Sequence, residues 1–221
     1  MGATVIVTGA LGALGRVVVA SLAGRGGCVA AVDLAPASEL SGAALVKGGL
    51  DLADETAVEQ AYAEIARELG PISGLVNIAG GFVWTPLEGG DLAHWDRMYR
   101  MNLRTAAVSC RAALGIFANQ GGGIVNIGAA AASNPGKGMA PYAASKAGVR
   151  ALTESLADEL RGRAIRVNAI LPTIIDTLAN RKDMPEADWS AWTRPESIAT
   201  VVAFLLSDDA RSISGAALPV M

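Results

Sequence analysis

The chain has 221 residues, of which 52% are hydrophobic and only 5% aromatic, and its formal net charge is −3. This length fits one α/β domain that buries a sizeable core. The slightly acidic balance gives no basic surface for nucleic acid, and no charge-free apolar stretch reaches the roughly twenty residues of a membrane span. We therefore expect neither a nucleic acid nor a membrane as a partner.

Cysteine and histidine usage adds two expectations. Cys28 falls in a predicted strand and Cys110 in a predicted helix, where each fits a small buried hydrophobic residue. With no secretory n-region, this usage predicts a reducing, cytoplasmic location. The only histidine, His94, excludes a multi-histidine metal site, so we expect no metal.

Apolar runs alternate with helical patterns along the whole chain. The predicted strands are 3–8, 27–33, 43–47, 73–78, 123–128, 164–171 and 215–220. The predicted helices are 13–24, 54–69, 91–118, 140–162 and 195–207. This alternation predicts a single Rossmann-like, doubly wound α/β domain over residues 1–221 with a seven-stranded parallel sheet. The stretch 173–194 interrupts the alternation, and we expect it to cover the substrate.

Ligands of such sheets bind beyond the carboxyl ends of the strands. One crevice is therefore expected to be faced by Thr8, Asp33, Asn77, Gly128 and Leu171.

A glycine-rich turn follows the first predicted strand. Gly9, Gly12 and Gly15 are evenly spaced between that strand and a buried helix, with Leu11 and Leu14 among them. Glycine lets the backbone turn tightly and approach a phosphate, and the helix N-terminus offers free N–H groups to an anion. The turn therefore predicts a dinucleotide pyrophosphate site. The alternative is a tight connection between strand and helix that binds no ligand.

An acidic residue, Asp33, ends the second predicted strand. In this position a carboxylate accepts hydrogen bonds from the ribose hydroxyls of NAD and repels the 2′-phosphate of NADP. We therefore expect NAD(H) to be the preferred cofactor, with NADP(H) possible.

Tyr142 and Lys146 lie four residues apart on the predicted helix 140–162 and therefore share one face. A lysine ammonium near a phenol favours the phenolate and lowers a pKa that is ordinarily about 10. This pair predicts a tyrosine that donates and accepts protons near neutral pH. The alternative for Lys146 is a surface charge, and the pattern alone is weak without the glycine turn.

The order of these motifs, with Asn77-Ile-Ala-Gly80 and Asn102 between them, resembles the short-chain dehydrogenase/reductase family over nearly the whole chain. The resemblance implies an NAD(P)-dependent oxidoreductase of a small-molecule substrate. Tyr142 would be the proton donor, Lys146 would bind the nicotinamide ribose, and Asn102 would link the lysine to bulk water. The alternative for Asn102 is a polar residue inside a helix, bonded to its own backbone.

The resemblance also implies cofactor contacts outside the glycine turn. Asp51 would meet the adenine amino group, or would instead cap the helix 54–69. Ala79 and Gly80 would lie beside the ribose, as would Asn77 unless it only stabilises the central sheet. Farther along the chain, the nicotinamide carboxamide would be held by Pro172 and Thr177.

Two departures from the family pattern point to its dihydropteridine reductase branch. The middle glycine of the turn falls one place early, at Gly12, and Ala129 stands where the family has its catalytic serine, thirteen residues before Tyr142. The stretch 171–192 resembles that branch closely. Asn102, however, follows the ordinary family pattern, so the resemblance leaves the substrate open.

The absent serine affects the expected chemistry. Losing one oxyanion donor costs on the order of 10²–10³ in turnover. The reduction of an ordinary ketone would be slowed by that loss, whereas the reduction of an electron-poor quinonoid dihydropterin should depend less on the serine hydroxyl. Ser133 is the nearest hydroxyl that could replace the serine, and Phe82 and Trp84 would either stack on a flat substrate or serve as plain core or lid aromatics.

Three hypotheses follow. The first is an NADH-dependent reductase of a quinonoid dihydropterin or a similar conjugated heterocycle. The second is an NAD(P)-dependent alcohol dehydrogenase or ketone reductase, and the third is a non-catalytic dinucleotide sensor. The resemblance also implies a homodimer or homotetramer assembled through the predicted helices 91–118 and 140–162.

Overall fold

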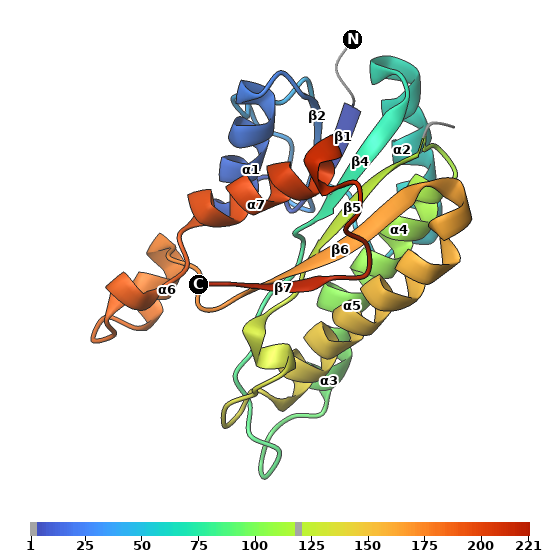
Figure 1. The fold of residues 1–221 in the computed structure, drawn as a ribbon. Coiled ribbons are helices and arrows are strands. Elements are labelled where there is room, and N and C mark those ends of the chain that lie inside the picture. Colours follow the sequence, from blue (N-terminus) through green and yellow to red (C-terminus); the bar gives the residue numbers. More distant parts are fainter. Residues whose placement is uncertain (1–3, 118–120) are drawn as a thin grey trace.

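Seven strands form one parallel sheet in a computed structural model that describes residues 4–117 and 121–221 (Figure 1). The strands are β1 (Thr4–Thr8), β2 (Cys28–Val32), β3 (Leu45–Lys47), β4 (Ile72–Asn77), β5 (Gly122–Ile127), β6 (Ile165–Pro172) and β7 (Ala217–Val220). Their order is β3-β2-β1-β4-β5-β6-β7. The predicted seven-stranded, doubly wound parallel sheet is confirmed, and the first residue of the predicted strand 3–8 lies outside the described residues.

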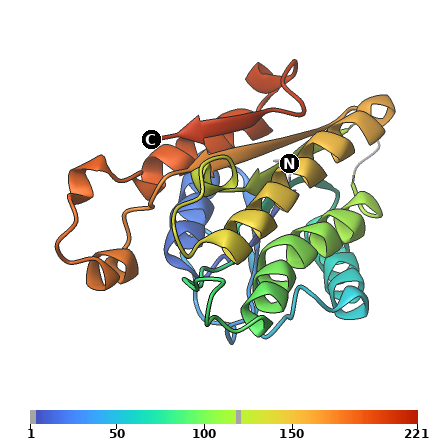
Figure 2. The same cartoon turned by 90° about the horizontal axis from the view of Figure 1, so that it is seen from below.

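Helices cover both faces of the sheet (Figure 1, Figure 2). Helices α1 (Ala13–Gly24) and α7 (Pro195–Leu206) pack on one face, and α2 (Glu55–Leu69), α4 (Thr105–Leu114) and α5 (Ala140–Glu159) pack on the other. All five residues of β1 are buried, as expected for a central strand covered on both sides. Within the described ranges, no helix is both long and apolar enough to cross a membrane.

The predicted helix 91–118 is not one regular α-helix. It consists of α3 (Ala93–Met98), a π-helical turn (Tyr99–Arg104) and α4, which ends at Leu114. Residue 118 lies outside the described residues. A π turn widens the helix by one residue, and such turns are frequent at functional sites. Shorter 3₁₀ turns lie at Ala130–Ala132, Arg161–Arg163, Trp189–Ala191 and Asp208–Ala210.

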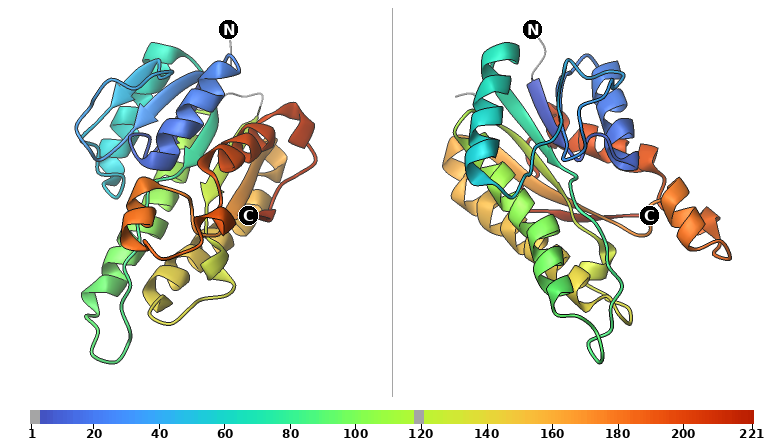
Figure 3. Two further views of the ribbon diagram at one scale, coloured as in Figure 1. Left: turned by 90° about the vertical axis from the view of Figure 1, so that its left-hand side faces the viewer. Right: turned by 180° about the vertical axis from the view of Figure 1, so that it is seen from behind.

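Residues 173–194, called the flap below, extend away from the sheet between β6 and α7 (Figure 3). The flap contains one helix that was not predicted, α6 (Leu178–Asp183). Its two ends are joined at the base, where Thr193 N donates to Ile174 O at 2.8 Å and Asp176 N donates to Thr193 O at 2.9 Å. The flap is therefore a loop whose two ends are hydrogen-bonded to each other, one following β6 and the other preceding α7.

Candidate active site

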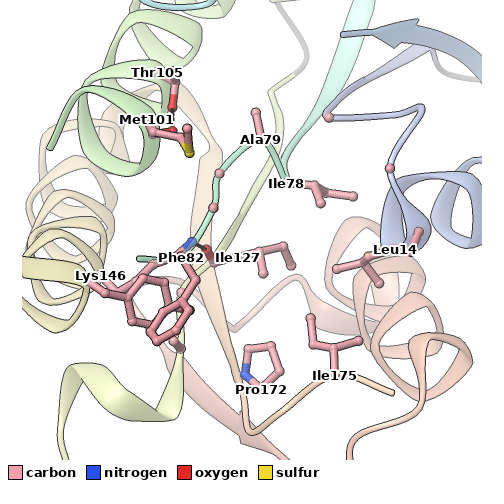
Figure 4. A pocket seen from close by; sticks show the side chains of 18 of the residues that line it. Leu14, Ile78, Ala79, Phe82, Met101, Thr105, Ile127, Lys146, Pro172 and Ile175 are labelled. Atoms are coloured by element: carbon pink, nitrogen blue, oxygen red, sulfur yellow. Dashed lines mark hydrogen bonds between the residues drawn. The ribbon is translucent and has the colours of Figure 1, made fainter. Parts of the chain in front are cut away.

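A cavity of about 1510 Å³ opens at the carboxyl ends of the strands. Leu14 and Ile175 lie on one side of it and Lys146 on the other, with Ile78 and Ile127 between them (Figure 4). The predicted site residues that line it are Gly9, Leu11, Gly12, Leu14, Gly15, Asp33, Asp51, Ala79, Gly80, Phe82, Trp84, Ala129, Tyr142, Lys146 and Pro172. Of the five strand-end residues expected to face one crevice, Asp33 and Gly128 do so, whereas Thr8, Asn77 and Leu171 do not line the cavity.

The glycine turn is shaped by close backbone contacts. Gly9 has a φ of 63°, and a Cβ there would lie 2.8 Å from the backbone nitrogen of Ala79. A Cβ on Gly15 would overlap the carbonyl oxygen of Gly9. Gly12 caps α1 without any side-chain hydrogen bond, so the first N–H groups of this helix stay available at the cavity wall. This cradle fits a pyrophosphate.

Asp33 joins the end of β2 to the glycine turn. Its Oδ2 accepts a hydrogen bond from Leu11 N at 2.8 Å, and its Oδ1 accepts one from Ala35 N at 2.9 Å. Because an ionised carboxylate offers about four acceptor positions, Asp33 retains capacity for ribose hydroxyls. The exposed Leu34 beside it also lines the cavity and adds no positive charge that would attract a 2′-phosphate.

Asp51 lines the cavity but does not cap helix α2. The N-cap is Asp54, whose side chain accepts from Ala57 N at 3.1 Å. Asp51 instead accepts from Ala53 N at 2.9 Å and from the Arg100 guanidinium at 2.6 Å. The pKa of the Asp51 carboxyl is held below its usual range mainly by the hydrogen bond from the Ala53 backbone, with a smaller contribution from the Arg100 guanidinium.

Asn77 does not reach the cavity. Its Nδ2 donates to Asn126 Oδ1 at 2.8 Å and to Cys110 Sγ at 3.3 Å, and Asn126 in turn donates to Thr153 Oγ1 at 2.9 Å. The side chain points into a buried network between the sheet and its helices. These contacts favour the sheet-stabilising alternative, and the expected place of Asn77 beside the ribose stays a prediction.

Lys146 is buried on α5 and donates from Nζ to the carbonyl oxygen of Ile127 at 2.8 Å. Burial lowers the pKa of Lys146 to about 8. Burial also raises the pKa of Tyr142 to about 12, which reverses the lowering expected from the lysine. The Lys146 ammonium is directed to a backbone carbonyl, and the Tyr142 ring packs edge-on against Phe82 at a centroid distance of 5.0 Å.

Asn102 lies in the π turn, is almost fully buried and is absent from the cavity lining. Its Oδ1 accepts from Gly81 N at 2.9 Å, and its Nδ2 donates to Gly81 O at 3.1 Å and to Ser145 Oγ at 2.9 Å. The side chain therefore does not bond to its own helix backbone, as one alternative proposed. The link from Asn102 to bulk water stays a prediction.

The position of the absent serine is occupied by a small apolar wall. Ala129 is buried at the cavity surface, and Ala130 and Ala131 continue the wall. Ser133 is exposed, accepts from Arg150 Nη1 at 3.4 Å and does not line the cavity. The turn after Ala129 thus leaves Ser133 on the outer surface, and its replacement of the absent serine stays a prediction. The next residue, Asn134, lines the cavity and was not predicted.

Aromatic and thioether side chains surround the same end of the cavity. Trp84 donates from Nε1 to Lys137 O at 2.9 Å, and its ring lies against Gly138, where a Cβ would overlap it. Phe82 and Trp84 are 52% and 56% exposed, so neither is a core residue. Sequence patterns had not identified Met139, which also lines the cavity, because only the folded loop brings it there.

The flap contributes a different set of residues from the one expected. Thr177 caps helix α6 by accepting from Asn180 N at 3.1 Å, and it does not line the cavity. Its expected contact with the nicotinamide carboxamide stays a prediction. The flap residues that line the cavity are Thr173, Ile174, Ile175, Asn180, Asp183 and Met184.

Comparisons with known proteins agree with this geometry. The family model described as short chain dehydrogenase matches residues 3–188. A D-threitol dehydrogenase from Mycolicibacterium smegmatis is 35% identical, over 99% of this chain and 91% of that protein. An acetoacetyl-CoA reductase from Synechocystis is 34% identical, over 98% of this chain and 93% of its own length. A short-chain type dehydrogenase/reductase structure from Mycobacterium ulcerans has a TM-score of 0.90 at 26% identity, covering 98% of this chain and 87% of that one.

Proposed function

Since this chain belongs to the short-chain dehydrogenase family and is an NAD(P)-dependent oxidoreductase, we propose that it reduces a conjugated heterocycle at the expense of NADH, with a dihydropteridine-reductase-like activity. The observation that carries the proposal is the apolar wall at Ala129, which stands beside an intact Tyr142 and Lys146. The site keeps a proton donor and lacks the hydroxyl that would polarise an ordinary carbonyl.

The proposed proton chemistry rests on Tyr142. With a pKa of about 12 its phenol holds a proton at neutral pH, which is the state that reduction requires. Lys146, with a pKa of about 8, is mostly an ammonium at neutral pH and would donate hydrogen bonds to the ribose hydroxyls. A bound nicotinamide supplies the hydride. Tyr142 then gives its proton to the reduced product.

The cavity walls support a flat substrate. Phe82, Trp84 and Met139 line the same cavity as Tyr142, and Phe82 packs edge-on against its ring. Aromatic rings favour stacked or edge-on contacts with other rings. A quinonoid dihydropterin is electron-poor and becomes aromatic when it accepts hydride. Such a substrate needs less help from a polarising hydroxyl than a ketone does, which fits the alanine wall.

A second candidate is a dehydrogenase or reductase of an alcohol–carbonyl pair. Asn134 supports it, because this residue lines the cavity and its side-chain amide carries N–H donors of the kind that stabilise a developing oxyanion. The names of the relatives, a D-threitol dehydrogenase and an acetoacetyl-CoA reductase, also favour it. A non-catalytic sensor would need only the glycine turn and Asp33, so it would give no reason for the presence of Tyr142 and Lys146.

The deciding experiment follows the loss of NADH absorbance with a freshly generated quinonoid dihydropterin, beside simple ketones and activated diketones. We expect rapid turnover of the pterin and slow turnover of simple ketones. Turnover of a carbonyl compound but not of the pterin would reject the dihydropteridine-reductase-like activity and favour the second candidate.

We expect Asp33→Ser to change the cofactor preference. The substitution removes the charge that repels a 2′-phosphate and the ribose acceptor, so KM should rise about tenfold for NADH and fall for NADPH. Steady-state kinetics with both cofactors measures this change. Because Asp33 also bonds Leu11 N, melting temperature is compared in parallel. An unchanged ratio of the two KM values would contradict the assigned role.

A further inference from the structure

We propose that Ser145 is a positioning residue that fixes the cofactor-side loop Gly80–Gly81 relative to Tyr142 and Lys146. The inference rests on the proposed function and concerns the same site. Ser145 is 3% exposed and does not line the cavity, so it acts only through its neighbours. It lies three residues after Tyr142 and directly before Lys146.

A continuous chain of hydrogen bonds runs through this serine. Its Oγ donates to the carbonyl oxygen of Tyr142 at 2.7 Å and accepts from Asn102 Nδ2 at 2.9 Å. The other Nδ2 hydrogen of Asn102 goes to Gly81 O at 3.1 Å, and Asn102 Oδ1 accepts from Gly81 N at 2.9 Å. Asn102 Nδ2 has a third, longer contact with Met98 Sδ at 3.7 Å, and a thioether sulfur is a weak acceptor, so the two oxygen acceptors make the stronger bonds.

The packing around these hydrogen bonds leaves little freedom for the loop Gly80–Gly81. A Cβ on Gly80 would lie 2.6 Å from Asn102 Oδ1 and 3.5 Å from Lys146 Nζ. A Cβ on Gly81 would lie 2.5 Å from Met101 Sδ. The two glycines therefore rest directly on the π turn and close to the lysine. Since Gly80 and Gly81 both line the cavity, their position affects cofactor and lysine together.

Removing the Ser145 hydroxyl affects its two hydrogen-bond partners differently. The carbonyl of Tyr142 lies within helix α5, so it keeps a helical hydrogen bond. Asn102 Nδ2 instead loses its acceptor in a buried place, and an unpaired buried donor is unfavourable. Only the weak acceptor Met98 Sδ remains near that hydrogen, so we expect the Asn102 amide to shift and to loosen its two bonds to Gly81.

The test compares Ser145→Ala with the hydroxyl-retaining Ser145→Thr. We expect Ser145→Ala to lower kcat about tenfold and to raise the Kd of NADH about threefold, with the substrate KM unchanged at saturating NADH. Ser145→Thr should restore both values. In a double mutant, Ser145→Ala should add little to Asn102→Ala, because both changes remove the same contact.

The matched control is Ser155→Ala on the same helix, where the exposed Ser155 donates to Glu159 Oε1 at 2.9 Å. Equal losses in the two alanine variants, or a lower melting temperature with unchanged kcat and Kd per folded molecule, would overturn the proposal. If Ser145→Ala does not fold, Ser145→Cys keeps the shape with a weakly bonding thiol and takes its place. NADH binding can be measured without substrate. A wild-type protein with no activity would reject the proposed function, and the Kd values of NADH for wild type, Ser145→Ala and Ser145→Thr would still test the role of Ser145.

Discussion

Tyr142→Phe is expected to lower kcat by about 10²–10⁴ while NADH affinity stays within about threefold of wild type. The substitution removes the phenolic proton donor and keeps the ring, which packs edge-on against Phe82 at 5.0 Å. The reduced product then has to take its proton from water. Stopped-flow or steady-state oxidation of NADH gives kcat, and fluorescence of bound NADH gives the affinity.

The matched control for this variant is Tyr99→Phe. Tyr99 is 53% exposed in the π turn and is not part of the cavity wall, so its phenol should be dispensable. Turnover of Tyr142→Phe within a few-fold of wild type would show that another group donates the proton. A joint loss of turnover and NADH binding would indicate instead that the ring is misplaced.

Ala129→Ser is expected to raise kcat/KM for an ordinary ketone by about 10²–10³, because it adds one donor where negative charge develops. Ala129 is 6% exposed and lines the cavity, so we expect the new hydroxyl to be close to the substrate. Reduction of a quinonoid dihydropterin should change by less than about tenfold, since that substrate relies less on a donor. The ratio of the two kcat/KM values is the measurement.

Ala132→Ser is the control for this gain, because Ala132 ends the same 3₁₀ turn and does not line the cavity. If Ala129→Ser gave no more ketone reduction than Ala132→Ser, the alanine wall would not be the cause of substrate choice. An equal gain for ketone and pterin would also contradict the argument, since it would mean that both substrates need the donor.

Local patterns were sufficient to predict the sheet, the glycine turn and the position of Asp33. Strand–glycine–helix order depends on neighbouring residues, and continuous apolar runs identify strands covered on both faces. Gly9 illustrates the point: its spacing predicted a tight turn, and its φ of 63° requires glycine. The π turn at 99–104 had no local signal, because it is stabilised by a contact from Asn102 to the distant Gly81.

Three predicted site residues have hydrogen-bond partners that the sequence did not indicate. Asn77 bonds to Asn126, and Ser133 accepts from Arg150. Thr177 is likewise used as a helix cap. A polar side chain can satisfy its hydrogen bonds in several ways, and the choice depends on partners far along the chain. Asn134, in contrast, lines the cavity, and its place there depends on how its loop folds.

The closed base of the flap has a consequence for how this fold diversifies. Thr173 and Thr193 meet through their hydroxyls at 2.7 Å, and Thr193 donates to Val220 O at 3.0 Å. The ends are thus held together by the sheet itself, and loop-closure entropy grows only slowly with length. We therefore expect the fold to tolerate insertions and deletions between 177 and 191. Such changes would alter the cavity lining at Asn180, Asp183 and Met184 while the sheet and helix α5 stay unchanged.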